Sequence, residues 1–591
     1  MPFKSLHPDL SIPETDVLTY LFPPLETPSK DPLWIDSKDP SISLSPAELF
    51  LWVRRLALGL ERTGTKKGEV IIIYTPNHIY VPVAYLAILS AGYAFSAANP
   101  AYTLREMIHQ IKNTEAKVIL AHPAMVETAL AAASKSGVPS CRIFQFSDSY
   151  CPPLKGIKDW TTMTATPQEG ERYIWRRLTP KQSKTTVATI NYSSGTTGPP
   201  KGVCVSHHNL IANVEQTIYM RFLEKPYTYA NRPQERWIGF LPLYHAYGQL
   251  YTILMAVKLK IPVYVMKQFV YRDFLQAIQD YKITTLQVAP PILVMLAKRA
   301  ETSGFDISSV KDVLCGAAPL SKELQNECMA RFGFNVVQGW GMTEVTCGAI
   351  HLPGGRRDDT GSVGELDPNC ECKLLDDDGN EVGVGKPGEM FIRGPNICLG
   401  YWKNNVATEE SISSDKWLRT GDVAVRNEAG SFWIVDRKKE LIKVNALQVA
   451  PAELESVLLE HEDIADAAVV GITLHSEEWP RAYVVMQEHA KGKVTPHDIQ
   501  QWIKPRVAKH KWLVGGVTFV TVVPKLASGK IQRKVVKEWA KLGDAIIVEE
   551  ACAIQTSEAV RETQKELLKE TRAAGVAIAQ WTTEARVVSN D

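Results

Sequence analysis

The stretch YSSGTTGPPKGV, residues 192–203, gathers hydroxyls, glycines and a lysine in a composition that suits neither a helix nor a strand. It follows VATIN, whose apolar character predicts a strand. A loop leaving a strand end can turn several N–H groups toward one anion. Gly195 and Gly198 permit positive φ and close backbone approach, and Lys201 adds a mobile positive charge. The stretch therefore predicts a loop that binds polyphosphate.

This loop is not a Walker A motif, because Gly202 follows Lys201 and two prolines break the helix start which that motif needs. The alternative interpretation is a flexible surface linker. A linker rarely carries a lone lysine after Pro-Pro between two strongly apolar segments, so a binding loop is favoured.

YSSGTTGPPKGV resembles the phosphate-binding signature of the adenylate-forming superfamily, which includes acyl-CoA synthetases, 4-coumarate–CoA ligases, beetle luciferases and peptide-synthetase adenylation domains. Seven later segments resemble family motifs in the family's order: LPLYHAYG (241–248), GAAPLSKEL (316–324), QGWGMTE (338–344), GEMFIRGPNICLGYW (388–402), WLRTGDVA (417–424), DRKKELIK (436–443) and PKLASGKIQRK (524–534). The resemblance is strongest to 4-coumarate–CoA ligase-like proteins and fungal aryl/acyl-CoA ligases.

The resemblance implies a reaction in two halves. A carboxylate attacks the α-phosphate of MgATP to give acyl-adenylate and pyrophosphate, and a thiol then displaces AMP. The first half brings anions together and needs cations and aimed donors. The residues it implies for ATP and AMP are Ser193, Ser194, Gly195, Thr196, Thr197, Lys201, Gln338, Gly339, Trp340, Thr343, Asp422, Arg437 and Lys530.

Four of the matching positions carry chemical roles. Lys530 matches the catalytic lysine, whose ammonium would stabilise charge on the carboxylate and phosphate. Thr343 and Glu344 match residues at the α-phosphate and Mg²⁺, which favours carboxylate and phosphate oxygens. His245 matches a histidine that orients the acid. Outside this context, Lys530 would be taken as solvated surface and His245 as structural.

The resemblance also implies the walls of an acyl pocket at Ala246, Tyr247, Gly316, Ala317 and Gly339. Most of these residues are small, which predicts a roomy, apolar pocket for an aromatic or medium-chain acid. Trp340 stands where relatives commonly have tyrosine, and its ring could stack on adenine. Asp422 could accept from both ribose hydroxyls, although out of context it would be read as a turn residue.

The resemblance implies that Lys443, Gln448 and Lys267 serve the half of the reaction that uses CoA. It also implies that Lys439 is the hinge between domains. Relatives usually carry Lys-Gly or Arg-Gly where this chain has Asn445-Ala446, and alanine is costly where positive φ is required. This departure leaves a second interpretation open, in which the acyl-adenylate passes to a carrier-protein thiol or an amine.

Composition sets the remaining limits. The 591 residues are 45% hydrophobic and 22% charged, with net charge +1, which gives no general attraction to nucleic acid. The ten cysteines show no CxxC pair, which favours a reduced compartment. No signal core, membrane span or peroxisomal tail is apparent, so we expect a cytoplasmic location.

Alternating apolar strands and amphipathic helices predict an α/β fold with mostly parallel sheets. Strands are expected at 69–76 and 116–123, a helix from a capping box at Ser45, and another at 321–333. The predicted domains are a large one at 1–438, with a β-barrel-like subdomain as in the family, a small α+β one at 439–543, with helices at 452–460 and 496–508, and a helix-prone extension at 544–591.

Together these observations predict an ATP-dependent carboxylate–CoA ligase with Mg²⁺ as cofactor and a small-molecule acid, ATP and CoA as partners. The alternative is an acyl-adenylating enzyme with another acceptor. A catalytically dead binding scaffold is disfavoured because Lys530, Asp422, Glu344 and the phosphate loop are all retained.

Overall fold

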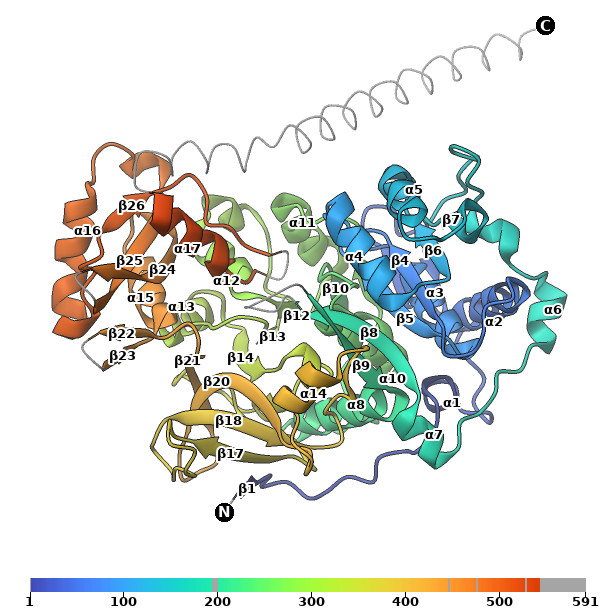
Figure 1. The fold of residues 1–591 in the computed structure, drawn as a ribbon, viewed down its shortest axis with the longest axis horizontal. Coiled ribbons are helices and arrows are strands. Elements are labelled where there is room, and N and C mark those ends of the chain that lie inside the picture. The colour runs from blue at the N-terminus through green and yellow to red at the C-terminus, as the bar shows by residue number, and fades with distance from the viewer. Residues whose placement is uncertain (1, 194–199, 445–446, 475–476, 527–528, 543–591) are drawn as a thin grey trace, which may run out of the picture. The chain divides into compact units, whose positions relative to one another are not determined.

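The computed structural model describes residues 2–193, 200–444, 447–474, 477–526 and 529–542 (Figure 1). The chain forms two compact units. The first takes the residues up to Lys439 together with Gly529 and Lys530, and the second begins at Glu440. Among the helices that the structure describes, none has both the length and the apolar content needed to cross a membrane.

A seven-stranded mixed sheet organises the N-terminal part of the first unit. Its order is β19 (Gly400–Tyr401), β9 (Lys201–Ser206), β8 (Val187–Ser193), β5 (Ala94–Ala98), β4 (Val70–Tyr74), β6 (Val118–Ala121) and β7 (Ile143–Gln145). Strands from β8 to β7 are parallel, whereas β8, β9 and β19 pair antiparallel. The strands expected at 69–76 and 116–123 are confirmed as β4 and β6.

Helices cover both faces of this sheet because β4 is apolar on both sides. Ile71 and Ile73 pack into one core with α2 (Pro46–Arg62) and α3 (Val81–Ser90). Ile72 and Tyr74 pack into a separate core with α4 (Leu104–Thr114) and α5 (Val126–Ser134). Alternate residues of a strand face opposite sides, so an uninterrupted apolar strand requires two covers. The capping box at Ser45 begins α2 as predicted.

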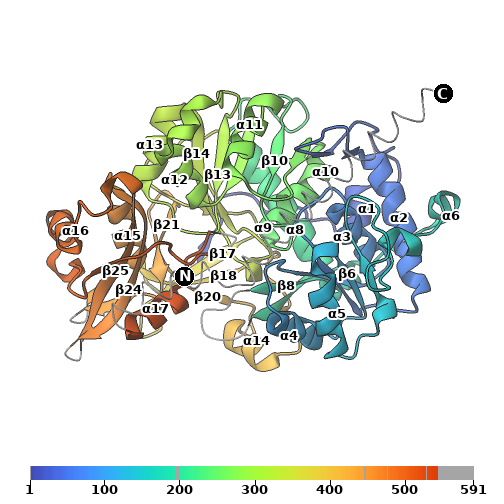
Figure 2. The same ribbon diagram turned by 90° about the horizontal axis from the view of Figure 1, so that it is seen from above.

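A nine-stranded mixed sheet forms the second layer of the first unit. Its order is β16 (Glu365–Leu366), β15 (Ile350–His351), β14 (Asn335–Trp340), β13 (Asp312–Cys315), β12 (Thr285–Val288), β10 (Trp237–Gly239), β11 (Val263–Val265), β2 (Trp34–Asp36) and β3 (Ser43–Leu44). One face packs on α11 (Tyr271–Tyr281), α12 (Pro290–Lys298) and α13 (Lys322–Phe332), which lie beside β10, β13 and β14 in Figure 2. The helix expected at 321–333 is confirmed as α13.

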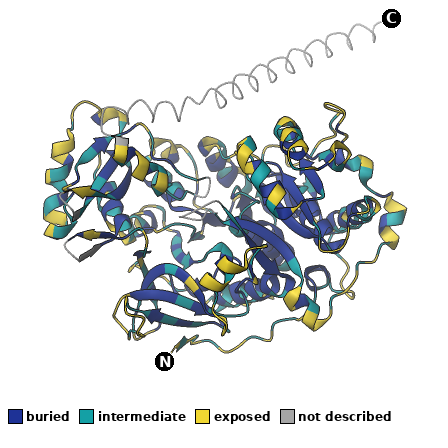
Figure 3. Cartoon of the chain, in the orientation of Figure 1, coloured by how far each residue is buried: buried dark blue, intermediate teal, exposed yellow. Residues whose placement is uncertain are grey.

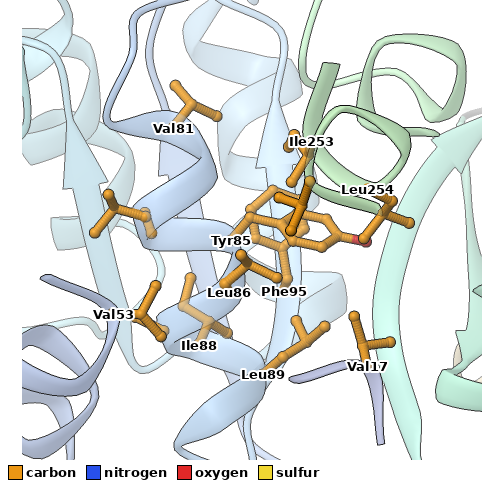
Figure 4. Packing of buried hydrophobic residues seen from close by; sticks show 14 of the residues in the cluster. Val17, Val53, Val81, Tyr85, Leu86, Ile88, Leu89, Phe95, Ile253 and Leu254 are labelled. Atoms are coloured by element: carbon orange, nitrogen blue, oxygen red, sulfur yellow. The ribbon is translucent and has the colours of Figure 1, made fainter. Parts of the chain in front are cut away.

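The largest core contains residues of both sheets. The rings of Tyr85 and Phe95 contact each other with 4.6 Å between centroids and planes tilted by 57°, and Ile253 and Leu254 lie against them in Figure 4. The last two belong to a π-helix, Gln249–Met255, whose residues are all buried. π-helical turns are rare and often mark functional sites. Figure 3 shows the strands of both sheets as mostly buried.

The remaining helices of the first unit are short or peripheral, apart from α8. They are α1 (Val17–Leu21), α6 (Pro167–Arg172), α7 (Pro180–Thr185), α8 (His207–Phe222), α9 (Ala246–Gly248), α10 (Ala256–Leu259) and α14 (Asn405–Ser411). α8 buries one face in the largest core through residues such as Leu210 and Val214.

An antiparallel five-stranded sheet is the third sheet of the first unit. Its order is β1 (Phe3–Lys4), β17 (Glu371–Leu375), β18 (Gly388–Arg393), β20 (Leu418–Arg426) and β21 (Phe432–Arg437). The inward residues Leu374, Ile392 and Phe432 form its own apolar core.

The second unit is α+β. Strands β24 (Ile464–Leu474), β25 (Glu477–Met486) and β26 (Val517–Phe519) form one sheet, and β22 (Ile442–Val444) pairs with β23 (Leu447–Val449). Its helices are α15 (Pro451–Leu459), α16 (Pro496–Ile503) and α17 (Arg533–Leu542). The helix expected at 496–508 ends earlier, at Ile503, because Pro505 lacks the N–H that would continue it.

Candidate active site

A cavity of about 130 Å³ lies past the carboxyl ends of β10, β13 and β14. In sheets with parallel strands, ligands bind in this position because the loops that leave the strands converge there. The structure brings together many residues that the sequence nominated separately. The predicted site residues that line it are Ser193, His245, Ala246, Tyr247, Gly316, Ala317, Gly339, Trp340, Thr343 and Lys530.

The strand ends determine which side chains reach the cavity. β13 ends at Cys315, and Gly316 and Ala317 follow directly. Ala317 has φ +73°, a left-handed conformation that costs a residue with a Cβ on the order of 1–2 kcal/mol. Such strain persists where the surrounding structure fixes the backbone, and it is common at functional sites. Gly339 and Trp340 are the last residues of β14.

A tight turn presents His245 to the cavity. A Cβ on Gly248 would lie 2.4 Å from the carbonyl oxygen of Pro242, so only glycine fits there. Burial lowers the pKa of His245 to about 4, and the positive charge of Lys530 adds to this effect. The imidazole is therefore neutral at pH 7 and can accept a hydrogen bond without adding charge.

Two aromatic side chains form part of the wall of the predicted acyl pocket. Tyr247 donates its hydroxyl to the carbonyl of Leu314 at 3.0 Å, and its ring meets Tyr251 edge-on at 5.3 Å. Tyr251 comes from the π-helix and also lines the cavity. The small residues predicted a roomy pocket, but Tyr251 adds a second ring beside the predicted Tyr247, and it comes from a segment that the motifs did not nominate. The cavity is consequently tighter than the sequence suggested.

The two ends of the phosphate loop are held together by β8 and β9, where Ser193 pairs with Lys201. Ser194, Gly195, Thr196 and Thr197 lie outside the described residues, so their predicted role stays a prediction. The ammonium of Lys201 lies 4.9 Å from the ring centre of Tyr401. Tyr401 in turn donates its hydroxyl to Glu344 at 2.9 Å.

Tyr401 therefore links the cation at the loop end to the carboxylate predicted to hold Mg²⁺. Glu344 is buried, and its charge together with burial raises the pKa of Tyr401, which keeps the phenol protonated as a donor. Sequence reasoning did not single out Tyr401, although it lies in the quoted segment ending in GYW. Its significance depends on β19 pairing with β9, which spacing alone does not reveal.

The predicted ribose group is assembled around Asp422. Arg437 lies opposite Asp422 across β20 and β21, and its Nε is 3.2 Å from Oδ1. The indole N–H of Trp340 donates to Oδ2 at 2.8 Å. This hydrogen bond orients the carboxylate, and the predicted stacking of the Trp340 ring on adenine stays a prediction.

Several predicted residues lie away from the cavity. The Gln338 amide donates to the side chain of Gln325 at 2.7 Å, so it faces α13. Lys267 forms ion pairs with Asp36 at 3.2 Å and Asp148 at 2.6 Å. Their roles in binding ATP and CoA stay predictions.

In the second unit, Lys443 is an exposed residue of β22. Asn445 and Ala446, and the side chain of Gln448, lie outside the described residues. The chain passes from one unit to the other after Lys439, and the hinge role of Lys439 stays a prediction.

One pair in the cavity wall was missed entirely. Nδ1 of His351 lies 2.8 and 3.0 Å from the two carboxylate oxygens of Asp367, and His351 lines the cavity. The two residues are far enough apart in sequence that no motif connects them. Only the pairing of β14, β15 and β16 brings them to the site.

The cavity lies at the strand ends of an α/β sheet, where enzymes of this architecture bind their ligands. The chain belongs to the AMP-binding enzyme family, which it matches over residues 26–402, and residues 453–530 match the AMP-binding enzyme C-terminal domain. The predicted family membership is confirmed.

The relatives include named ligases. The chain is 34% identical to the phenylacetyl-CoA ligase epaB of Aspergillus niger, over 90% of this chain and 97% of that protein. It is also 34% identical to a probable 4-coumarate–CoA ligase 1 of Dictyostelium discoideum, over 91% and 97%. The anthranilate CoA ligase AuaEII, solved with anthranoyl-AMP, has the same fold, with TM-score 0.78 and 21% identity over 89% of this chain and 97% of that one. The predicted fold class is confirmed.

Proposed function

We propose that this chain is an ATP-dependent carboxylate–CoA ligase that activates an aromatic acid. The carboxylate oxygen attacks the α-phosphorus of ATP, the bond to pyrophosphate breaks, and acyl-AMP forms. The sulfur of CoA then attacks the acyl carbon, AMP leaves and the thiol proton is released. The membership in the AMP-binding family and the named ligases among its relatives support this reaction.

One observation carries the proposal. A single cavity is lined by Ser193 from the phosphate loop, Thr343 from the GMTE segment, His245 and Lys530, beside an apolar wall. Acyl-adenylate formation needs the phosphate chain and an apolar acid at adjacent points. A site that bound only a nucleotide would not need the apolar wall.

Charge at this site comes from lysine rather than histidine. His245 is neutral at pH 7 because its pKa is lowered to about 4, so it can orient the acid or a hydroxyl without repelling a cation. The ammonium of Lys530 would stabilise the negative charge that builds on the reacting oxygens.

Mg²⁺ would be held by Glu344 and the phosphate oxygens. Glu344 fits this role, because it is a buried carboxylate with one oxygen oriented by Tyr401, and Mg²⁺ commonly binds one or two carboxylates plus substrate phosphates. When bound, the ion would neutralise phosphate charge. Tyr401 keeps the carboxylate aimed, and Lys201 would meet the outer phosphates.

The aromatic side chains in the cavity wall favour an aromatic acid. Tyr247 and Tyr251 give the cavity aromatic walls that suit edge-to-face contact with a ring.

A medium-chain acid is the competing substrate class, and a carrier protein is the competing acceptor. We place the reaction in the cytoplasm as part of the same proposal.

The first experiment is a product analysis. The full chain is given MgATP, CoA and a pool of benzoic, phenylacetic, cinnamic and medium-chain acids, and products are identified by mass spectrometry. Aryl-CoA products are expected. Acyl-adenylates without acyl-CoA would show that CoA is not the acceptor. If none of these acids supports ATP consumption, the proposed class of acid would be wrong.

A further inference from the structure

The wall of the cavity contains a histidine backed by a fully buried carboxylate. Asp367 is 0% exposed, and both of its oxygens face Nδ1 of His351 at 2.8 and 3.0 Å. Of the side chains that the structure describes, none other hydrogen-bonds this carboxylate. Burying a charge is costly unless it is paired, so this pair is a built feature rather than an incidental contact.

The contact determines which ring nitrogen of His351 faces outward. A carboxylate only accepts, so Nδ1 must carry the proton that it shares with Asp367. The other nitrogen, Nε2, then remains for a further partner. No group in the described part of the chain hydrogen-bonds Nε2, while the residue lines the cavity. Tyr247 in the same wall already donates to Leu314.

Two glycines make the space for this ring. A Cβ on Gly348 would lie 2.5 Å from Cε1 and 2.7 Å from Nε2 of His351, and one on Gly339 would lie 3.3 Å from Cδ2. Gly348 is fixed because its carbonyl accepts from the buried amides of Asn213 and Asn396. Any larger residue at position 348 would displace the imidazole. The wall is therefore shaped to present the imidazole.

We infer that His351 is a specificity-determining residue that recognises a hydroxyl on the acyl part of the substrate, and that Asp367 is its positioning residue. This inference rests on the proposed function. A hydroxyl can donate to Nε2, which acts as an acceptor because Nδ1 carries the proton. A second carboxylate would be placed near the buried charge of Asp367, which disfavours a diacid.

The same geometry disfavours acids that lack the hydroxyl. An unsubstituted ring would cover Nε2 and leave a polar atom unpaired, which is unfavourable. A methyl ether adds bulk and cannot donate. The chain should therefore rank a hydroxylated aryl acid above both its unsubstituted parent and its methyl ether.

The test measures pyrophosphate release by the full chain with matched acids. Each of benzoic, phenylacetic and cinnamic acid is compared with its 3- and 4-hydroxy derivatives, their methyl ethers and the corresponding 4-carboxy acid. For the preferred parent acid, at least one hydroxy derivative is expected to have kcat/KM about tenfold above the parent and its methyl ether.

Variants connect this preference to the pair. His351→Phe should bring the hydroxylated and parent acids within about twofold of each other, mainly through loss on the hydroxylated acid. Asp367→Asn should lower the ratio of kcat/KM for the hydroxylated acid to kcat/KM for the parent acid. Because His351→Phe leaves the carboxylate buried and unpaired, the double variant His351→Phe/Asp367→Leu removes both partners and should show the same loss.

A matched control is His7, whose side chain pairs with Glu365 at 3.1 Å and is 9% exposed but does not line the cavity. His7→Phe should keep the preference. Equal kcat/KM for hydroxylated and parent acids in the wild type, or an unchanged preference in the double variant, would overturn the inference while leaving the ligase intact. Absence of pyrophosphate release with every acid would instead overturn the proposed function, and this inference with it.

Discussion

The indole N–H of Trp340 donates to Oδ2 of Asp422 across 2.8 Å, and both side chains are buried. This bond connects the end of β14 in the nine-stranded sheet with β20 in the antiparallel sheet. With Arg437 on Oδ1, it fixes both oxygens of one carboxylate. A preorganised acceptor of this kind suits a ribose diol, because no ordering cost is then paid when the nucleotide binds.

Asp422→Ala is expected to weaken ATP binding by roughly ten- to hundredfold, the range for hydrogen bonds to a charged group. Trp340→Phe keeps a ring and removes only the N–H, so its effect should be smaller. Calorimetric titration with ATP gives both dissociation constants. The exposed Asp415→Ala is the matched control. An ATP dissociation constant that does not move in Asp422→Ala would contradict the ribose role.

Lys530→Ala should lose adenylate formation by about a hundredfold or more, because a positioned charge at the developing oxyanion is removed. ATP should still bind. The measurements are pyrophosphate release and ATP titration on the same sample. Lys534→Ala changes an exposed lysine of α17 and should leave both unchanged. Retained pyrophosphate release in Lys530→Ala would show that this lysine does not catalyse adenylate formation.

Acid should destabilise the fold through buried histidines. His207 is buried, its Nδ1 accepts from the N–H of Val17 at 3.2 Å, and burial lowers its pKa from 6.5 to about 4. As the pH falls, the unfolded chain therefore binds a proton at His207 before the folded chain does. The stability that the neutral ring provides is present above pH 6.5 and is lost between pH 6.5 and about 4, on the order of 3 kcal/mol in total.

His207→Asn tests this directly. The asparagine oxygen can take the place of Nδ1 as acceptor but does not titrate, so stability should fall less steeply between pH 6.5 and 4. Melting temperature and denaturant midpoint across that range give the slope, which should change by about one proton. His497→Asn alters an exposed histidine and should leave the slope as in the wild type. An identical slope in His207→Asn would mean that other groups dominate acid unfolding.

Local sequence patterns predicted helices and strands well. They predicted contacts between residues far apart in the chain poorly. The apolar run in β4 and the capping box at Ser45 are decided by neighbours in sequence, so both could be predicted. The contacts of Lys267 with Asp36 and Asp148 join segments far apart along the chain. A spacing rule carries no information about such pairs, which is why Lys267 could be nominated without its partners.

The candidate site shows the same division. His245, Thr343 and Lys530 lie in motifs, and the cavity contains all three. Tyr251 reaches the cavity from a π-helix. The period of a π-helix differs from that of an α-helix, and no helical pattern in the sequence predicts it. His351 reaches the cavity through strand register. Sequence reasoning missed Tyr251 and His351 because their positions in the cavity depend on tertiary packing.

Gly248→Ala should destabilise the first unit and impair adenylation together. The added Cβ would lie 2.4 Å from the carbonyl oxygen of Pro242 and 2.9 Å from its carbon. Both are backbone atoms, so the turn carrying His245 must move, at a cost of about 1–3 kcal/mol. Denaturant unfolding measures the stability and pyrophosphate release the activity.

Gly304 provides the comparison for that substitution, because a Cβ there would meet nothing within 4 Å. Gly304→Ala should unfold at the wild-type denaturant concentration or slightly above it, since alanine restricts the unfolded chain. Equal stability of the two alanine variants would show that the turn at Pro242 can relax. Lost activity at unchanged stability in Gly248→Ala would instead show that the turn mainly positions His245, whose ring must then have moved within an intact fold.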